Sequence, residues 1–150
     1  MGFGTPTVEL EGDYSTWTEK WISPTLTVMS VVGDGLCFGA IDVNGKKVYL
    51  RDSEAGTAIL NLDDGVVISD DDLARFGTKI YWLDMAHSIK SKYVVIFESW
   101  TSFRIYKDGL LKQTVTIPGA TLSGFLISSD GKYIIAHRDD THKVHCYEGS

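Results

Sequence analysis

The sequence predicts an all-β domain, and three observations support this prediction. Short runs rich in Val, Ile, Tyr, Phe and Thr recur along the chain, punctuated by Gly and Asp, as in strands joined by turns. Dipeptides that favour tight turns stand between pairs of such runs. Helix signals are confined to two short segments, 14–21 and 69–76. We therefore expect helix to occupy less than about 12% of the residues.

Length and composition bound the classes of protein to consider. The chain has 150 residues, of which 43% are hydrophobic and 23% charged, which suits one folded domain spanning residues 1–150. The net charge of -6 argues against nucleic-acid binding. No apolar run reaches the roughly 20 residues of a membrane-spanning helix, and the N-terminus does not read as a signal peptide.

Cysteine usage bears on the compartment. Cys37 and Cys146 lie far apart in sequence and make no disulfide framework, so we expect both to be small buried side chains. The sequence also lacks an Asn-x-Ser/Thr glycosylation acceptor. These features predict a reducing, cytoplasmic location.

Three dipeptides mark hairpin turns. They are Asn44-Gly45, Asp108-Gly109 and Asp130-Gly131, and each stands between two β-prone runs. Asn-Gly and Asp-Gly accept the positive φ angles that a two-residue turn needs. We expect the glycine of the first and third turns to depend on that freedom, so a β-branched replacement of Gly45 should destabilise the fold.

An internal repeat organises the chain. Three units align, at residues 26–62, 79–118 and 121–148. Each unit alternates apolar strands with turns and has a strand ending in an aromatic residue: Tyr49, Tyr106 or Tyr147. We expect these tyrosines to occupy equivalent positions on the third strand of each unit. Their neighbours Val48, Ile105 and Cys146 should then face the other way.

The third unit also contains a recognisable turn motif. Ser129-Asp130-Gly131-Lys132-Tyr133 resembles the turn that joins the first two strands in the blades of WD40-like and quinoprotein-like β-propellers. The resemblance covers roughly residues 26–150 and is generic to propellers. It implies three tandem four-stranded antiparallel blades. A β-sandwich or barrel is the alternative, because repeated hairpins also occur there.

The third unit stops one strand short. Residues 5–11 alternate apolar and acidic side chains and have the length to fill the gap. Three blades do not close a ring, because propellers use 4–8. We therefore expect a homodimer of six blades, in which residues 5–11 complete the third unit of the partner. A fragment of a longer propeller would show the same sequence.

One histidine-rich hairpin is a candidate metal site. His137, Asp139 and His145 come from two predicted strands and the loop between them. If His137 and His145 face each other, two imidazoles and a carboxylate could bind a transition metal. The competing interpretation is that these are polar loop residues.

Two tryptophans are candidate ligand-binding residues. Trp100 falls in a predicted loop between strands, where an exposed indole would suit a sugar or peptide. Trp21 is the second candidate. It lies four residues after Trp17, so the two rings could share one face of a helical turn and pack on a neighbouring blade or subunit, or bind ligand.

The sequence favours a non-catalytic binding or assembly module. It contains no Gly-x-Ser-x-Gly elbow, phosphate-binding glycine loop or dinucleotide motif, and nothing implies a cofactor. The expected partners are a second copy, another protein or a carbohydrate. The alternatives are a sugar-binding propeller formed by oligomerisation, and an enzyme or metal site at the ring centre that uses Asp84, His87 and His137.

Overall fold

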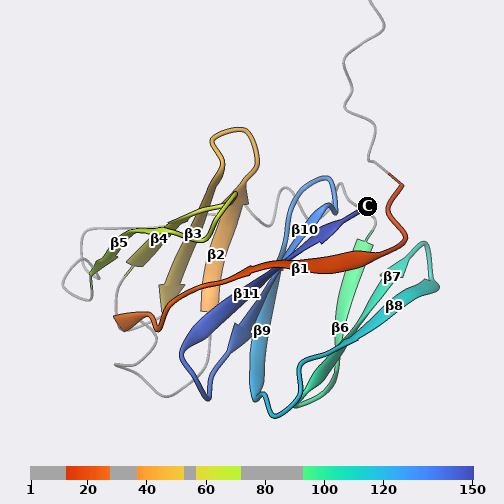
Figure 1. Cartoon of the computed structure of the whole chain (residues 1–150). Coiled ribbons are helices and arrows are strands. Elements are labelled where there is room, and N and C mark those ends of the chain that lie inside the picture. The colour runs from red at the N-terminus through yellow and green to blue at the C-terminus, as the bar shows by residue number, and fades with distance from the viewer. Residues whose placement is uncertain (1–12, 28–36, 53–56, 72–92) are drawn as a thin grey trace, which may run out of the picture.

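The computed structural model describes residues 13–27, 37–52, 57–71 and 93–150, and Figure 1 shows their arrangement. Within these ranges the regular structure is extended strand, which confirms the all-β prediction. The strands are β1 (Trp17–Ile22), β2 (Cys37–Asp42), β3 (Lys47–Asp52), β4 (Thr57–Asn61), β5 (Val67–Asp71), β6 (Tyr93–Ser99), β7 (Ser102–Lys107), β8 (Leu110–Thr116), β9 (Leu122–Ile127), β10 (Tyr133–Arg138) and β11 (Lys143–Gly149).

The strands form three antiparallel sheets. The first sheet has the order β2-β3-β4-β5, and the second sheet has the order β6-β7-β8. The central sheet has the order β1-β11-β10-β9. In each sheet, strands that are consecutive in sequence pair as hairpins, and the N-terminal strand β1 is the single exception because it pairs with β11 from the C-terminus.

The central sheet lies between the other two, and its strand β9 packs beside both β2 and β6 (Figure 1). A separate hydrophobic core packs against each face of the central sheet. Ile135 and Cys146 pack with the first sheet, whereas Ile134 and Tyr147 pack with the second. Because adjacent residues of a strand point to opposite faces, runs without polar alternation suit a sheet that is covered on both sides.

Strand β1 completes the central sheet within the same chain. Trp17 pairs with Gly149 and Ile22 with His145, so β11 has a neighbour on each side. The expected strand at residues 5–11 lies outside the described residues, and the edge assigned to it is already occupied. The expectation that only a partner chain could fill this edge is therefore wrong: β1 reaches it because the third unit lies beside the first.

Two expected helical segments are strands. Residues 17–21 form most of β1, and residues 69–71 end β5. Residues 72–76 lie outside the described residues. In β5, extended backbone at 67–71 pairs with β4, and this pairing overrides the weak capping signal of Ser69.

The described parts of each predicted repeat unit contain hairpins, but in the first two units the strand that carries the tyrosine differs from the prediction. Among the described residues Tyr49 and Tyr106 each lie on the second strand of their sheet. Tyr147 instead lies on β11, the third strand of the series β9, β10 and β11. The predicted opening strands of the first two units fall mainly at 28–36 and 72–92, outside the described residues. The predicted alternation holds, because Val48, Ile105 and Cys146 are all buried in core.

The three predicted hairpin turns differ in detail. Asp108 and Gly109 form a two-residue turn with φ angles of 52° and 80°, as expected for a mirror-image turn. The β2–β3 turn has four residues, and its positive φ (55°) falls on Lys46 instead of Gly45. The Gly45 N–H donates to Asp42 Oδ1 at 2.9 Å, so a side chain there would meet that carboxylate. The conformational reason given for Gly45 is therefore wrong.

Two further expectations concern burial and membranes. Cys146 is buried with a free thiol, and its burial raises the pKa of that thiol to about 12. The structure places Cys37 in β2 and does not describe its side chain. Across the described ranges, no helix has the length and apolar character required to cross a membrane.

Candidate binding surface

The face of the second sheet that points away from the central sheet carries several exposed apolar side chains, with Arg104 and Thr114 opposite one of them, Ile96. Val94 pairs with Tyr106, which pairs with Leu111, so these three side chains form one row across the sheet. Ile96 follows Val94 on the same face. Val94, Ile96 and Leu111 are 52%, 48% and 52% exposed. We call Val94, Ile96, Tyr106 and Leu111 the outer face.

The opposite face of the same sheet is buried core. Phe103 and Ile105 are fully buried, and Phe103 packs against Phe125 and Tyr147 of the central sheet with ring centroids 4.9 and 5.6 Å apart. The second sheet therefore has apolar side chains on both faces, like the central sheet. Among the described residues only one of its faces is covered.

An ion pair lies on the outer face itself, because Arg104 stands opposite Ile96 on the middle strand β7. Arg104 Nη2 lies 2.7 Å from Glu98 Oε1, and the Ser102 hydroxyl donates to Glu98 Oε2 at 2.9 Å. These hydrogen bonds, first from Ser102 and then from Arg104, lower the pKa of Glu98 below its ordinary value. The charge nearest to Ile96 is thus already neutralised by a partner, which lowers the cost of covering this face.

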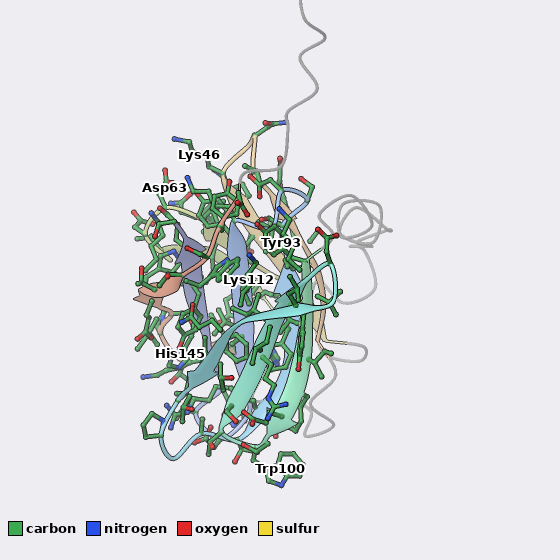
Figure 2. The ribbon with its side chains drawn as sticks, turned by 90° about the vertical axis from the view of Figure 1, so that its right-hand side faces the viewer. Lys46, Asp63, Tyr93, Trp100, Lys112 and His145 are labelled. Carbon is green, nitrogen blue, oxygen red and sulfur yellow. The ribbon has the colours of Figure 1, made fainter. Side chains whose placement is uncertain are left out.

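Trp100 lies in the β6–β7 turn and is 66% exposed, as its candidate role requires. Figure 2 shows it projecting from the end of the molecule, far from Lys46 and Asp63. Its ring packs edge-on against the Phe97 ring, with centroids 5.7 Å apart, and the Phe97 and Phe125 rings have centroids 6.2 Å apart. The Trp100 carbonyl oxygen accepts a hydrogen bond from Leu122 N–H at 2.8 Å, so the turn is fixed to the central sheet.

Polar groups flank the exposed indole. The Ser99 hydroxyl lies 2.8 Å from that of Ser102 and 3.3 Å from that of Thr101. A flat apolar ring beside several hydroxyls can stack on a ligand and also bond it. We call Phe97, Trp100 and these three hydroxyl residues the Trp100 corner.

The structure buries Trp21, the second candidate. Its ring is 8% exposed and lies in the core between the central and first sheets. Its Nε1–H donates to the Leu62 carbonyl oxygen at 2.6 Å. Of the two expected roles, packing and ligand binding, Trp21 therefore has the packing role. Its ring does not reach the surface.

The candidate metal ligands do not converge. His145 pairs with Ala136, and His137 pairs with Val144, so the two imidazoles point to opposite faces of the central sheet. The expectation that they face each other is wrong because their register differs by one residue. Asp139 lies in the turn, and within the described residues no three metal-binding side chains come together. Asp84 and His87 lie outside those residues.

Each histidine instead meets one polar partner. His137 Nδ1 lies 3.1 Å from the Ser123 hydroxyl, and His145 Nδ1 lies 2.8 Å from Glu19 Oε1. Burial lowers the pKa of His137 to about 4, with a smaller contribution from His142. Its Nε2 has no hydrogen-bond partner among the described residues, so Ser123 and His137 lack the orienting group of a hydrolase triad.

The outer face was missed by the sequence analysis, although the sequence contained a signal. Tyr93–Phe97 is apolar without alternation, which indicates a strand covered on both faces. The predicted sites were aromatic rings and polar clusters, whereas aliphatic residues in a strand are typical of core. Only the structure shows which half of the run is left exposed.

Comparisons with known proteins add no family. No protein-family model matches the chain, and no curated protein matches it significantly.

Proposed function

We propose that this chain is a non-catalytic assembly module, built as propeller-like blades, whose outer face binds a protein surface. One observation carries the proposal: the second sheet carries apolar side chains on both faces, but among the described residues only the inner face is covered, and Val94, Ile96 and Leu111 are exposed on the other. Exposed apolar area costs roughly 25 cal/mol per Å², so covering this face stabilises a complex. Large exposed apolar patches mark interaction sites in soluble proteins.

The blade interpretation is supported by the arrangement of the sheets. Each is an antiparallel meander, and β2, β9 and β6, the first described strands of their hairpin series, lie next to one another. An N-terminal strand that completes the last repeat is a common way for propellers to close. The same features suit a stack of sheets that continues beyond three.

Mass in solution and dye binding test the proposal together. We expect the full chain either to sediment above its 16.6 kDa monomer mass or to bind the apolar dye bis-ANS as a folded monomer. Ile96→Lys should remove whichever signal is present, because it places a charge in the outer face. The matched control is Val66→Lys, since Val66 is equally exposed in the β4–β5 turn. A monomer that binds no dye contradicts the proposed function.

A carbohydrate is the second candidate ligand, and the Trp100 corner favours it. An indole held on a fixed turn beside three hydroxyls has the composition of a sugar-stacking site. Labelled full-length protein should bind members of a glycan array, and Trp100→Ala should lose at least about tenfold in affinity for them. Trp100→Phe should retain part of the binding. Equal binding by the wild type and Trp100→Ala contradicts this role.

A further inference from the structure

One peptide group holds two turns of the chain side by side, and each turn carries a residue that the sequence analysis singled out. The Leu122 N–H donates to the Trp100 carbonyl oxygen at 2.8 Å, and the Asp139 N–H donates to the Thr121 carbonyl oxygen at 2.8 Å. The Thr121 C=O and the Leu122 N–H belong to the same peptide group and point in opposite directions. The β6–β7 turn and the β10–β11 turn therefore flank that group, at the lower end of the molecule in Figure 1.

The carboxylate of Asp139 has no partner within the described part of the chain. Its neighbour Asp140 takes the nearby cation instead, since Arg138 donates to Asp140 from Nε at 2.9 Å and from Nη2 at 3.0 Å. Asp139 is nevertheless half-buried. Partial removal of a carboxylate from water is unfavourable without compensating hydrogen bonds, and an ionised carboxylate only accepts them. Asp139 therefore suits a ligand that donates hydrogen bonds.

The Trp100 indole provides an apolar platform on the other side of the same peptide group. The ring is 66% exposed, and its backbone is already fixed by the hydrogen bond from Leu122, so less ordering is needed when a ligand stacks on it. The arginines of the adjoining strands are both paired, Arg104 with Glu98 and Arg138 with Asp140. This combination of an apolar ring, an unpaired carboxylate and paired arginines favours a neutral ligand that carries hydroxyl groups.

We propose that the Trp100 corner extends to Asp139 and binds a neutral oligosaccharide of at least two sugars. One sugar stacks on the Trp100 indole, and hydroxyl groups of a neighbouring sugar donate to the Asp139 carboxylate. The inference rests on the carbohydrate role proposed above as the second candidate, and it names the class of carbohydrate.

The spacing of the two turns sets the length of the ligand. The Trp100 carbonyl oxygen and the Asp139 nitrogen are separated by two hydrogen bonds and one peptide group, roughly 8 Å in all, which is longer than one pyranose ring. A single sugar on the indole therefore leaves the carboxylate without a donor, whereas a second sugar can reach it. Two neighbouring hydroxyls of that sugar can each donate to one carboxylate oxygen.

Isothermal titration of the full chain with sugars of different length tests the inference. The probes are cellotriose, maltotriose and chitotriose, compared with glucose and N-acetylglucosamine. At least one trisaccharide should bind at least about tenfold more tightly than its monosaccharide. Asp139→Ala should remove most of that difference and leave the affinity for the monosaccharide unchanged. Asp139→Asn, which keeps one acceptor oxygen, should be intermediate.

Asp63→Ala is the matched control. Asp63 is also an aspartate outside the strands, and Figure 2 shows it far from Trp100. This variant should bind every probe as the wild type does. Circular dichroism checks that all variants keep the strand signal, which is expected because Asp139 contributes its backbone N–H, and not its side chain, to the turn.

The outcomes separate this inference from the carbohydrate role on which it rests. A trisaccharide affinity that Asp139→Ala leaves unchanged, or that equals the affinity of the monosaccharide, overturns the extension to Asp139 and keeps Trp100 as a site for one sugar. If none of the three trisaccharides binds at about 10 mM, the inference is overturned, while array binding that Trp100→Ala abolishes still supports the carbohydrate role. Equal binding of every probe by the wild type and Trp100→Ala overturns both.

Discussion

Trp17 and Trp21 lie on opposite faces of the central sheet although they are four positions apart in one strand. In a regular strand such a pair would share a face. The pairing with β11 shifts between Glu19 and Trp21. Lys20 is therefore an extra residue, a β-bulge, with no residue of β11 opposite its backbone. Trp17 therefore packs with the second sheet and Trp21 with the first. The six-residue strand β1, itself part of the central sheet, thus contributes a tryptophan to the packing against each of the other two sheets.

Deleting Lys20 should be tolerated. Without it, Glu19 still pairs with Tyr147 and Trp21 with Cys146, and both indoles keep their faces. The deletion removes the bulge and an exposed ion pair with Glu148, which contributes less than about 1 kcal/mol. We expect cooperative urea unfolding with a slightly lowered midpoint.

Deleting Thr18 is the matched control for this prediction. It also restores one-to-one pairing, but it would move Lys20 into the position where Glu19 meets His145. An ammonium there replaces the carboxylate that pairs with the buried His145, so this deletion should lower the unfolding midpoint more. Equal midpoints for the two deletions would show that the contact between Glu19 and His145 contributes little to stability.

The docking of Trp21 should be among the largest side-chain contributions to stability. Its ring lies against Gly65 of the β4–β5 turn, and its Nε1–H donates to Leu62. Trp21→Ala should lower the free energy of unfolding by about 3–5 kcal/mol through the cavity left behind. Trp21→Phe, which loses mainly the hydrogen bond, should cost about 1–3 kcal/mol. Chemical denaturation measures both, and similar losses would mean that the ring contributes little packing.

Gly131 should be more sensitive to alanine than Gly109. Both have φ near +80°, at 77° and 80°, so alanine strains the backbone by about 1–2 kcal/mol at either position. At Gly131 a Cβ would also overlap the Tyr93 ring, whereas at Gly109 nothing lies nearby. We expect Gly131→Ala to lower the denaturation midpoint clearly further. If the two variants match, the contact between Tyr93 and the β9–β10 turn does not constrain the fold.

Stability should fall between pH 6.5 and 4 because of His137. Its pKa is about 4 in the folded chain and about 6.5 when unfolded, so in this window only the unfolded chain binds the proton. Stability is fully present above pH 6.5 and is lost as the pH falls toward 4. From pH 7.5 to 5 this amounts to about 2 kcal/mol.

Denaturation of the wild type and His137→Gln at those two pH values measures the effect. The variant is expected to be less stable overall but to lose about 2 kcal/mol less on acidification. His142→Gln, which removes a neighbouring imidazole, should keep most of the wild-type pH dependence. An unchanged pH dependence in His137→Gln would contradict the burial of a neutral imidazole.

Local features of the fold could be predicted because local rules set them. Asp108-Gly109 has the residue types of a mirror-image turn, and the structure forms that turn. The alternation around Val48, Ile105 and Cys146 was also predictable, since side-chain period follows from strand geometry. Strand β5, which was not predicted, ends in two acidic residues. It is extended because it pairs with β4, and the strand propensity of its own residues does not include that pairing.

The candidate sites were less predictable for a related reason. The loop position of Trp100 follows from its neighbours, and its exposure agrees with that position. The faces of His137 and His145 depend on the register between two strands, and one residue of shift reverses them. The same applies to Trp21, whose face is decided by the bulge at Lys20.

The sequence by itself determined most of the strands, the Asp108-Gly109 turn and the apolar positions, because these depend on residues a few places apart. The tertiary structure alone decided the order of the sheets, the strand that fills the edge of the third unit and the faces that stay exposed. Pairing β1 with β11 joins residues more than 120 positions apart, at a cost in chain entropy that only the combined packing of both cores repays. The outer face is left exposed by that same arrangement, since the central sheet covers one side of the second sheet and no other described sheet reaches the other.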